Sequence, residues 1–154
     1  MVEEESEYAE SVVPASTDNK PGTGVGTEIP DKATLYIFAS DYVSAYRNKD
    51  LSRIKSFFMS DATENGVPIA SVFPVYKTNF KNTVFKKYDI KITTTDIIDG
   101  GGYVKGDFVI RFLDHTTRQV KESSGNIAWK LLWVDDKWKV EELNYNIEKV
   151  VSID

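Results

Sequence analysis

The hydrophobic pattern between residues 32 and 58 has the period of an α-helix, with one polar interruption. One stripe of a 3.6-residue helix collects six of these positions: Leu35, Phe38, Ala39, Tyr42, Ala45 and Tyr46. Pro30–Asp31 marks the start, since an aspartate there can accept from unpaired backbone N–H groups. The polar break at Asn48–Asp50 ends this helix, and Asp50 can cap a short second one. The second helix turns four residues inward: Leu51, Ile54, Phe57 and Phe58.

A third helix is predicted over about residues 71–81. Val72, Tyr76 and Phe80 are spaced by four residues there. Pro74 would break a helix interior but is tolerated in the first turn, where its missing N–H has no partner. Its position therefore predicts that the helix starts near Ser71.

From residue 84 onward the period of the apolar residues changes from helical to two, which is typical of strands. The alternating positions of four long strands are Tyr88, Ile90 and Ile92; Val104, Gly106, Phe108, Ile110 and Phe112; Ile127, Trp129, Leu131 and Trp133; and Trp138 and Val140, then Leu143, Tyr145 and Ile147. The alternation slips at Glu141–Glu142, which predicts a β-bulge that bends the last strand. We expect an α+β domain with three N-terminal helices packed on a strongly curved antiparallel sheet of about four long strands. The curvature would leave a concavity between the sheet and the helices.

Residues 1–30 differ in composition from the rest of the chain. They are rich in Glu, Ser, Thr, Pro and Gly and contain one aromatic residue, Tyr8. Such a segment buries too little apolar surface to offset its ordering entropy, so we expect a disordered acidic tail or linker. The glycine-rich run 22–26 has no strand before it and no helix after it, which argues against a nucleotide loop. The predicted domain covers residues 31–154, and the tail suggests an accessory domain of a larger protein.

Charge and composition exclude several functional classes. Residues 1–30 hold seven acidic side chains against Lys20, so the remaining residues carry a net charge of about +1 out of the total of −5. A nearly neutral domain offers no basic field for nucleic acid. No apolar run reaches the roughly 20 residues that span a bilayer, and no secretory signal is recognisable. Without cysteine there is no disulfide to indicate a compartment, so the localisation stays open.

Two stretches resemble the NTF2-like superfamily: DYVSAYRNKDLSRIKSFFMSDAT (residues 41–63) and WKLLWVDDKWKV (residues 129–140). With the third helix and the four long strands, the similarity covers about residues 30–148. The superfamily includes ketosteroid isomerases, SnoaL-type cyclases and many uncharacterised bacterial domains. The resemblance implies a cone-shaped cavity, which enzymes, ligand binders and adaptors in the superfamily all use, so the fold does not give the function.

The resemblance to the isomerases allows us to ask whether this chain has their catalytic residues. Those enzymes need a carboxylate base, a tyrosine donor and a protonated acid, and the alignment places the donor on Tyr42, the base on Gly66 and the acid near Ala128. No acidic residue lies between positions 125 and 134. A donor without a base cannot shuttle a proton, so no catalytic residue is assigned. An acid beside Tyr42 in the cavity would instead favour an enzyme.

Polar residues that could line the concavity are the candidate ligand-binding residues: Tyr42, Tyr46, Tyr76, Arg111, Glu142 and Asn144. The structural alternative is that the tyrosines are core residues and that Arg111 and Glu142 are solvated or pair across strands. The single histidine, His115, falls in a predicted turn, and we expect no metal site and no cofactor.

The three tryptophans of the last two strands, Trp129, Trp133 and Trp138, are the interface candidates. They either form a homodimer interface on the open face of the sheet or fill the cone. The leading hypothesis is a noncatalytic NTF2-like module that binds a small apolar ligand or a protein partner and self-associates. The alternative is a small-molecule isomerase, lyase or cyclase that acts in the cavity.

Overall fold

The computed structural model describes residues 30–153. The predicted acidic tail lies outside the described residues, except for Pro30. Three helices are present in the described part: α2 (Ala33–Arg47), α3 (Leu51–Ser56) and α4 (Ile69–Asn82). The Asp50 side chain accepts a hydrogen bond of 3.1 Å from the backbone N–H of Arg53, which confirms the predicted cap of the second helix.

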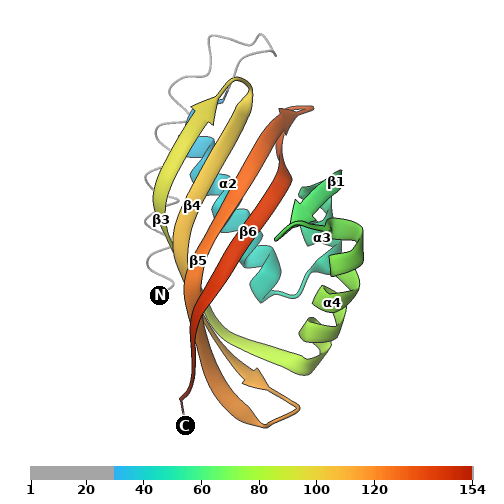
Figure 1. The fold of residues 1–154 in the computed structure, drawn as a ribbon, viewed down its shortest axis with the longest axis vertical. Helices are drawn as coiled ribbons and strands as arrows, with labels where there is room; N and C mark the ends of the chain where they lie inside the picture. The colour runs from blue at the N-terminus through green and yellow to red at the C-terminus, as the bar shows by residue number, and fades with distance from the viewer. Residues whose placement is uncertain (1–29, 154) are drawn as a thin grey trace.

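Six strands form one sheet in residues 30–153: β1 (Phe58–Glu64), β2 (Val67–Pro68), β3 (Thr83–Ile98), β4 (Gly101–Asp114), β5 (Gln119–Val134) and β6 (Lys137–Ser152). Their order across the sheet is β2-β1-β6-β5-β4-β3. The four long strands pair antiparallel, whereas β1 pairs parallel with β6. In Figure 1 the long strands bend together, α2 lies against one face, and α4 stands on the side of the sheet where β1 pairs with β6.

The predicted α+β class and the four long antiparallel strands are confirmed, and two short strands are added to them. The polar, glycine-containing residues 61–68 indicate a turn with at most one brief strand, and Phe58 is assigned to the second helix, whereas the structure forms β1 and β2 here. The third helix starts at Ile69, two residues before the predicted Ser71, so Pro74 lies inside the helix beyond its first turn.

Four bulges interrupt the long strands, and they explain the bend of the sheet. The predicted bulge in β6 is confirmed: Lys130 pairs with Glu142 and Leu131 with Val140, which leaves Glu141 as the extra residue. A second bulge in β6 lies between positions 147 and 149, and β3 contains two more. An extra residue on one strand increases the local twist and bends the strand.

Glycines lie opposite two of these bulges. Gly125 pairs with Ile147, and a Cβ atom on Gly125 would lie 1.9 Å from the backbone oxygen of Asn146. Gly106 lies opposite the second bulge of β3, where a Cβ atom would lie 2.6 Å from the backbone oxygen of Lys91. The absence of a side chain therefore allows the two backbones to approach at the bends.

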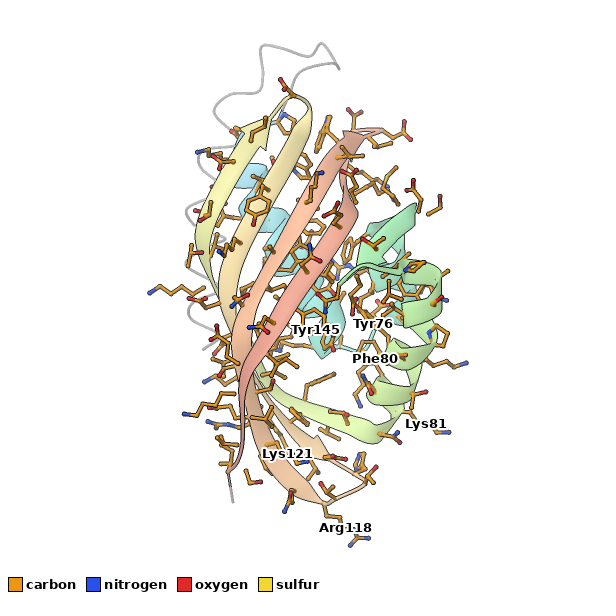
Figure 2. All side chains as sticks on the ribbon, in the orientation of Figure 1. Tyr76, Phe80, Lys81, Arg118, Lys121 and Tyr145 are labelled. Atoms are coloured by element: carbon orange, nitrogen blue, oxygen red, sulfur yellow. The ribbon has the colours of Figure 1, made fainter. Side chains whose placement is uncertain are left out.

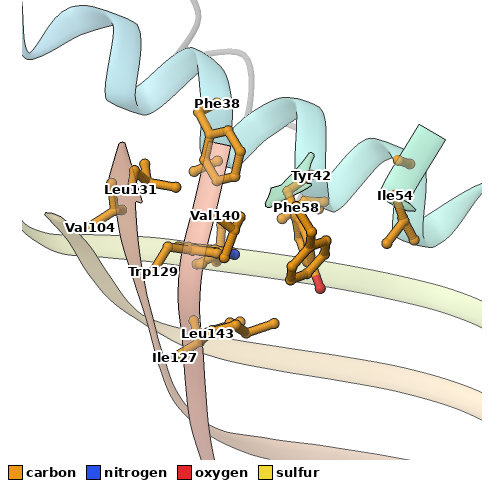
Figure 3. Packing of buried hydrophobic residues seen from close by; sticks show 14 of the residues in the cluster. Phe38, Tyr42, Ile54, Phe58, Val104, Ile127, Trp129, Leu131, Val140 and Leu143 are labelled. Atoms are coloured by element: carbon orange, nitrogen blue, oxygen red, sulfur yellow. The ribbon is translucent and has the colours of Figure 1, made fainter. Parts of the chain in front are cut away.

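The core lies between α2 and the sheet (Figure 3). The ring of Phe38 packs edge-on to Trp129 at 5.9 Å, and Tyr42 packs edge-on to the same indole at 5.3 Å. Trp138 contacts Trp133 at 5.0 Å and donates a hydrogen bond of 2.9 Å from Nε1 to Oγ1 of Thr34. Burying such rings against the helix supplies the apolar burial that stabilises the domain.

The tryptophans do not form an exposed patch. Trp129 is 0% exposed and Trp138 is 7% exposed, while Trp133 is half-buried against the core. Their placement corrects the choice of these residues as interface candidates, because they lie on the sheet face that α2 covers. They fill the fold, which was the alternative.

No helix within residues 30–153 combines the length and the apolar composition that crossing a membrane requires.

The close approach at Gly125 predicts a large effect of a single methyl group. We expect Gly125→Ala to lower the free energy of unfolding by at least about 2 kcal/mol, because the added Cβ would overlap a backbone oxygen that cannot move without breaking the strand pairing. Urea denaturation measures this change, and Ser124→Ala on the neighbouring residue is the matched control. Equal stability of the two variants would contradict the role of the glycine in the bend.

Candidate functional site

A cavity of about 500 Å³ lies between the sheet, the end of α2 and α4. Aromatic and aliphatic side chains form most of its wall, and Val75, Ile147 and Val150 at its border are about half exposed. The cavity is therefore open to solvent on one side. Figure 2 shows Tyr145 of β6 facing Tyr76 and Phe80 of α4 across this space.

Glu64 is the buried acid of the cavity. It ends β1, lines the cavity and is only 6% exposed. Its position follows from two hydrogen bonds of the next residue: the backbone N–H of Asn65 donates to the Leu143 carbonyl at 2.8 Å, and the Asn65 side-chain oxygen accepts from the Tyr145 N–H at 2.8 Å. These bonds fasten the end of β1 to β6 and bring the Glu64 carboxyl beside Tyr145.

Tyrosine hydroxyls surround the Glu64 carboxyl. The hydroxyl of Tyr76 donates to Oε1 of Glu64, and the hydroxyls of Tyr42 and Tyr76 lie 3.1 Å apart. Tyr145 also hydrogen bonds to the carboxyl. A hydroxyl has one hydrogen to donate, so when Glu64 is ionised the donors run in one direction, from Tyr42 to Tyr76 to Glu64.

Burial raises the pKa of the Glu64 carboxyl above its ordinary value, and hydrogen bonds from Tyr76 and Tyr145 offset part of this rise. Burial also raises the pKa of each nearby tyrosine, and the negative charge of Glu64 adds to this effect. The tyrosines affected are Tyr42, Tyr46, Tyr76, Tyr88 and Tyr145. Among the described residues Glu64 is therefore the one carboxyl of this cluster, and its surroundings favour its neutral form.

The tyrosines continue into a connected set of aromatic rings. Tyr46 packs against Tyr76 at 5.9 Å, against Phe80 and Phe85 at 5.2 Å, and against Tyr88 at 5.3 Å. Several of these contacts are edge-to-face, which is a favourable arrangement for aromatic pairs. The rings thus pack around the hydroxyl cluster in the wall of the cavity.

The structure brings together three of the six candidate ligand-binding residues. Tyr42, Tyr46 and Tyr76 line the cavity, whereas Arg111, Glu142 and Asn144 do not. The side chains of these last three residues project from the other face of the sheet, because their positions alternate with cavity-lining or buried residues along β4 and β6. This corrects their assignment to the cavity.

Two of these residues pair across neighbouring strands, as the structural alternative predicted. Arg111 forms an ion pair of 2.9 Å with Glu122 of β5. Glu142 lies 3.9 Å from the ammonium group of Lys130. Asn144 is exposed.

The expectation that the cavity contains no acid is wrong, because Glu64 lies in its wall. Gly66, the position aligned with the isomerase base, falls in a turn with a positive φ of 83°. The carboxyl in the cavity belongs to Glu64, two residues earlier in the chain. Period-two alternation from Ala62 predicts an inward Glu64, and Asn65–Gly66 is a typical hairpin turn. These two signals could have identified the residue.

The remaining polar residues lie toward the lower end of the cavity and include Asn82, Asp114 and Thr116. The backbone N–H of His115 bonds to the Asn82 carbonyl at 2.9 Å, which ties the β4–β5 hairpin to the end of α4. Within residues 30–153 no three His, Asp or Glu side chains gather closely enough to hold a metal ion.

Comparison with known proteins gives structural similarity without sequence similarity. No model of a known protein family matches the chain, and no curated protein matches it in sequence. A ketosteroid isomerase-like protein from Erwinia carotovora atroseptica has a TM-score of 0.67 at 14% identity, over 77% of this chain and 96% of that one. An NTF2-like superfamily protein from Salmonella enterica serovar Typhimurium has a TM-score of 0.65 at 12% identity, over 77% and 91% of the two chains.

A third similar structure is an NTF2-like protein of unknown function from Shewanella oneidensis, with a TM-score of 0.58 at 14% identity, over 72% of this chain and 94% of that one. All three identities are low, so the similarity concerns the course of the backbone and not the site. The curved sheet, the three helices and these solved structures together show that the chain has the NTF2-like fold.

Proposed function

We propose that the cavity binds a small, mostly apolar molecule with one polar group, and that Glu64 and its tyrosines hold this group. The observation that supports the proposal is the buried carboxyl in the wall of an otherwise mostly apolar cavity. Ligand sites commonly have this composition, with a volume of about 300–1,000 Å³, mainly apolar walls and a few placed polar groups.

The hydrogen-bond network favours binding over proton transfer. A keto–enol shuttle needs a base and a hydroxyl donor available to the substrate at the same time. When Glu64 is ionised and can act as a base, the hydrogen of Tyr42 points to Tyr76 and that of Tyr76 points to Glu64. Neither hydroxyl then offers its hydrogen to a ligand.

A small-molecule isomerase, lyase or cyclase is the second candidate. Two observations favour it: an acid, Glu64, is joined to Tyr42 through Tyr76 in the cavity, and burial raises the pKa of this acid. A carboxyl whose pKa is raised by burial is a stronger base when it is ionised, and general bases are often tuned in this way. The similarity to the isomerase-like protein concerns the fold and does not decide between the two candidates.

Self-association stays a prediction, as does a role as an accessory domain. The sheet face that the helices leave uncovered carries the Arg111–Glu122 pair and the Lys130 cluster with Glu141 and Glu142. A dimer through this face would therefore use polar contacts more than the tryptophans. Solution mass by light scattering at rising protein concentration tests it, and a monomer throughout would contradict it.

A bulky side chain at the border of the cavity should block binding. Ile147 lines the cavity and is 50% exposed, whereas its neighbour Asn146 projects from the opposite face of β6. We expect Ile147→Trp to weaken binding of the neutral fluorescent probe N-phenyl-1-naphthylamine at least about tenfold, because the indole occupies the cavity. Asn146→Trp is the matched control and should bind like the wild type, and equal affinity of the two variants would contradict the proposal.

The stability of the protein should depend on the ionisation of Glu64. Its pKa is raised in the folded state, so the stability it contributes is fully present below the unfolded-state pKa and is lost as the pH rises through the folded-state pKa. Glutamine cannot ionise and avoids this loss. We therefore expect the free energy of unfolding of Glu64→Gln, relative to wild type, to increase as the pH rises from below the unfolded-state pKa of Glu64 through its raised folded-state pKa.

Urea denaturation at several pH values measures this difference. Glu142→Gln makes the same substitution on the outer face of the sheet and is the control. If the free energy of unfolding of Glu64→Gln relative to wild type stays constant or decreases as the pH rises, burial does not disfavour the charged carboxyl.

Hydrogen exchange distinguishes the two candidate functions. An isomerase that uses Glu64 as its base should speed the exchange of α-hydrogens of a small cyclic ketone in D₂O, and Glu64→Gln should slow this reaction by about a hundredfold or more. We expect no acceleration by either protein, because the hydroxyls of Tyr42 and Tyr76 donate within the hydrogen-bond network when Glu64 is ionised. NMR follows the exchange, and acceleration that depends on Glu64 would establish the enzyme instead.

A further inference from the structure

The charges that line the cavity are of one sign. Glu64 and Asp114 are acidic, and no lysine, arginine or histidine of residues 30–153 is part of the wall. Lys81, Arg118 and Lys121 project near the lower end of the molecule, outside the cavity (Figure 2), and Lys121 is 3.7 Å from Asp114. The cavity thus disfavours an anion and can accommodate a cation.

Glu64 is a buried acid without a cationic partner in the described part of the chain. The side chains that hydrogen bond to it are tyrosines, which are neutral, and no ion pair among residues 30–153 includes it. Buried charges in proteins are normally paired. A carboxylate can accept about four hydrogen bonds, and Tyr76 and Tyr145 supply two, so acceptor capacity remains for a ligand.

Aromatic rings surround this carboxyl and complete the chemistry that a cation requires. Tyr46, Tyr76, Tyr88 and Tyr145 line the same cavity and are close enough to Glu64 for its charge to raise their pKa values. Phe85 and Phe108 extend the aromatic wall. The faces of such rings carry negative potential and attract an ammonium group, most strongly where water is excluded.

We infer that the ligand of this cavity is a small apolar amine, bound as its ammonium ion. The ammonium group donates to the free acceptor positions of Glu64 and lies against the tyrosine rings, and the apolar body of the ligand fills the space toward Ile110, Ile127 and Ile147. The inference rests on the proposed binding function and adds the charge of the ligand to it.

A matched set of three probes tests the inference. 1-Naphthylmethylamine, 1-naphthalenemethanol and 1-naphthoic acid share one ring system and differ in charge. Each competes with N-phenyl-1-naphthylamine for the wild-type protein near neutral pH. We expect the amine to bind about tenfold more tightly than the alcohol, and the acid to bind most weakly.

Two variants assign the preference to Glu64. Glu64→Gln keeps the approximate shape of the side chain but removes its charge and replaces one acceptor oxygen with an NH2 donor, so it should bind the amine no more tightly than the alcohol. Glu142→Gln, on the outer face, should keep the order of the wild type. Near-ultraviolet circular dichroism verifies the fold of both variants.

A pH series gives an independent readout. The groups that face Glu64 are tyrosines from α2, α4, β3 and β6, namely Tyr42, Tyr46, Tyr76, Tyr88 and Tyr145, so within residues 30–153 Glu64 is the one carboxyl of this cluster. Asp114, the other acid of the cavity wall, has a pKa lowered by the backbone hydrogen bond from Thr116, so it should lose its charge only at a lower pH than Glu64. Protonation of Glu64 at low pH should remove the advantage of the amine over the alcohol, since the amine stays charged and the carboxyl becomes neutral.

The outcomes separate the two proposals. If the alcohol or the acid binds as tightly as the amine to wild type, or if Glu64→Gln keeps the preference for the amine, the inference is wrong and the binding function stands. If neither N-phenyl-1-naphthylamine nor any of the three probes binds to the wild type, the proposed binding function fails, and the inference fails with it.

Discussion

The bend of the sheet is the constraint on which the other features depend. Four long strands that stayed straight would pack against α2 along their whole length and leave no cavity. Extra residues in β3 and β6 bend the strands, and Gly106 and Gly125 allow the partner backbones to follow them. The helix covers the upper half of the concave face, and the lower half diverges from it. The cavity is the space that this divergence leaves.

The parallel pairing of β1 with β6 places an acidic side chain in the wall of this cavity. β1 is short and ends at Glu64, so its last side chain lies where the apolar wall of the cavity meets α4. The hydrogen bonds of Asn65 fix the end of the strand, and Tyr76 and Tyr145 approach the carboxyl from two different elements. Burial of an acid would be costly without these donors. The acid and its tyrosines therefore form one unit.

Sequence analysis could predict the parts of the fold that have a strong period. The helix stripe from Leu35 to Tyr46, the cap at Asp50 and the bulge after Val140 follow from hydrophobic spacing and local chemistry, and the structure contains all three. β1 was missed because seven residues with four polar side chains give only a weak alternation. The start of α4 was placed two residues late, because Pro74 was assumed to lie in the first turn.

The candidate site was predicted only in part, for a similar reason. The helical period identifies Tyr42, Tyr46 and Tyr76 as inward residues, and they do line the cavity. Arg111, Glu142 and Asn144 were chosen for their polarity, but the alternation along β4 and β6 places them on the outer face. Glu64 was outside every recognised element, so its direction was not assigned, although the alternation from Ala62 and the turn at Asn65–Gly66 indicate it. Tyr145 and Tyr88 were correctly assigned to an apolar face, but the sequence does not show that this face meets Glu64.

The single hydrogen on each tyrosine hydroxyl has one more consequence. If Glu64 takes up a proton, it can become the donor to Tyr76, and Tyr76 can donate to Tyr42. The hydrogen of Tyr42 is then released from the chain and can turn toward an acceptor on a bound molecule. Protonation of Glu64 thus reverses the direction of the hydrogen bonds among Glu64, Tyr76 and Tyr42. The same pocket therefore offers a hydrogen-bond acceptor to a ligand at higher pH and a hydrogen-bond donor at lower pH.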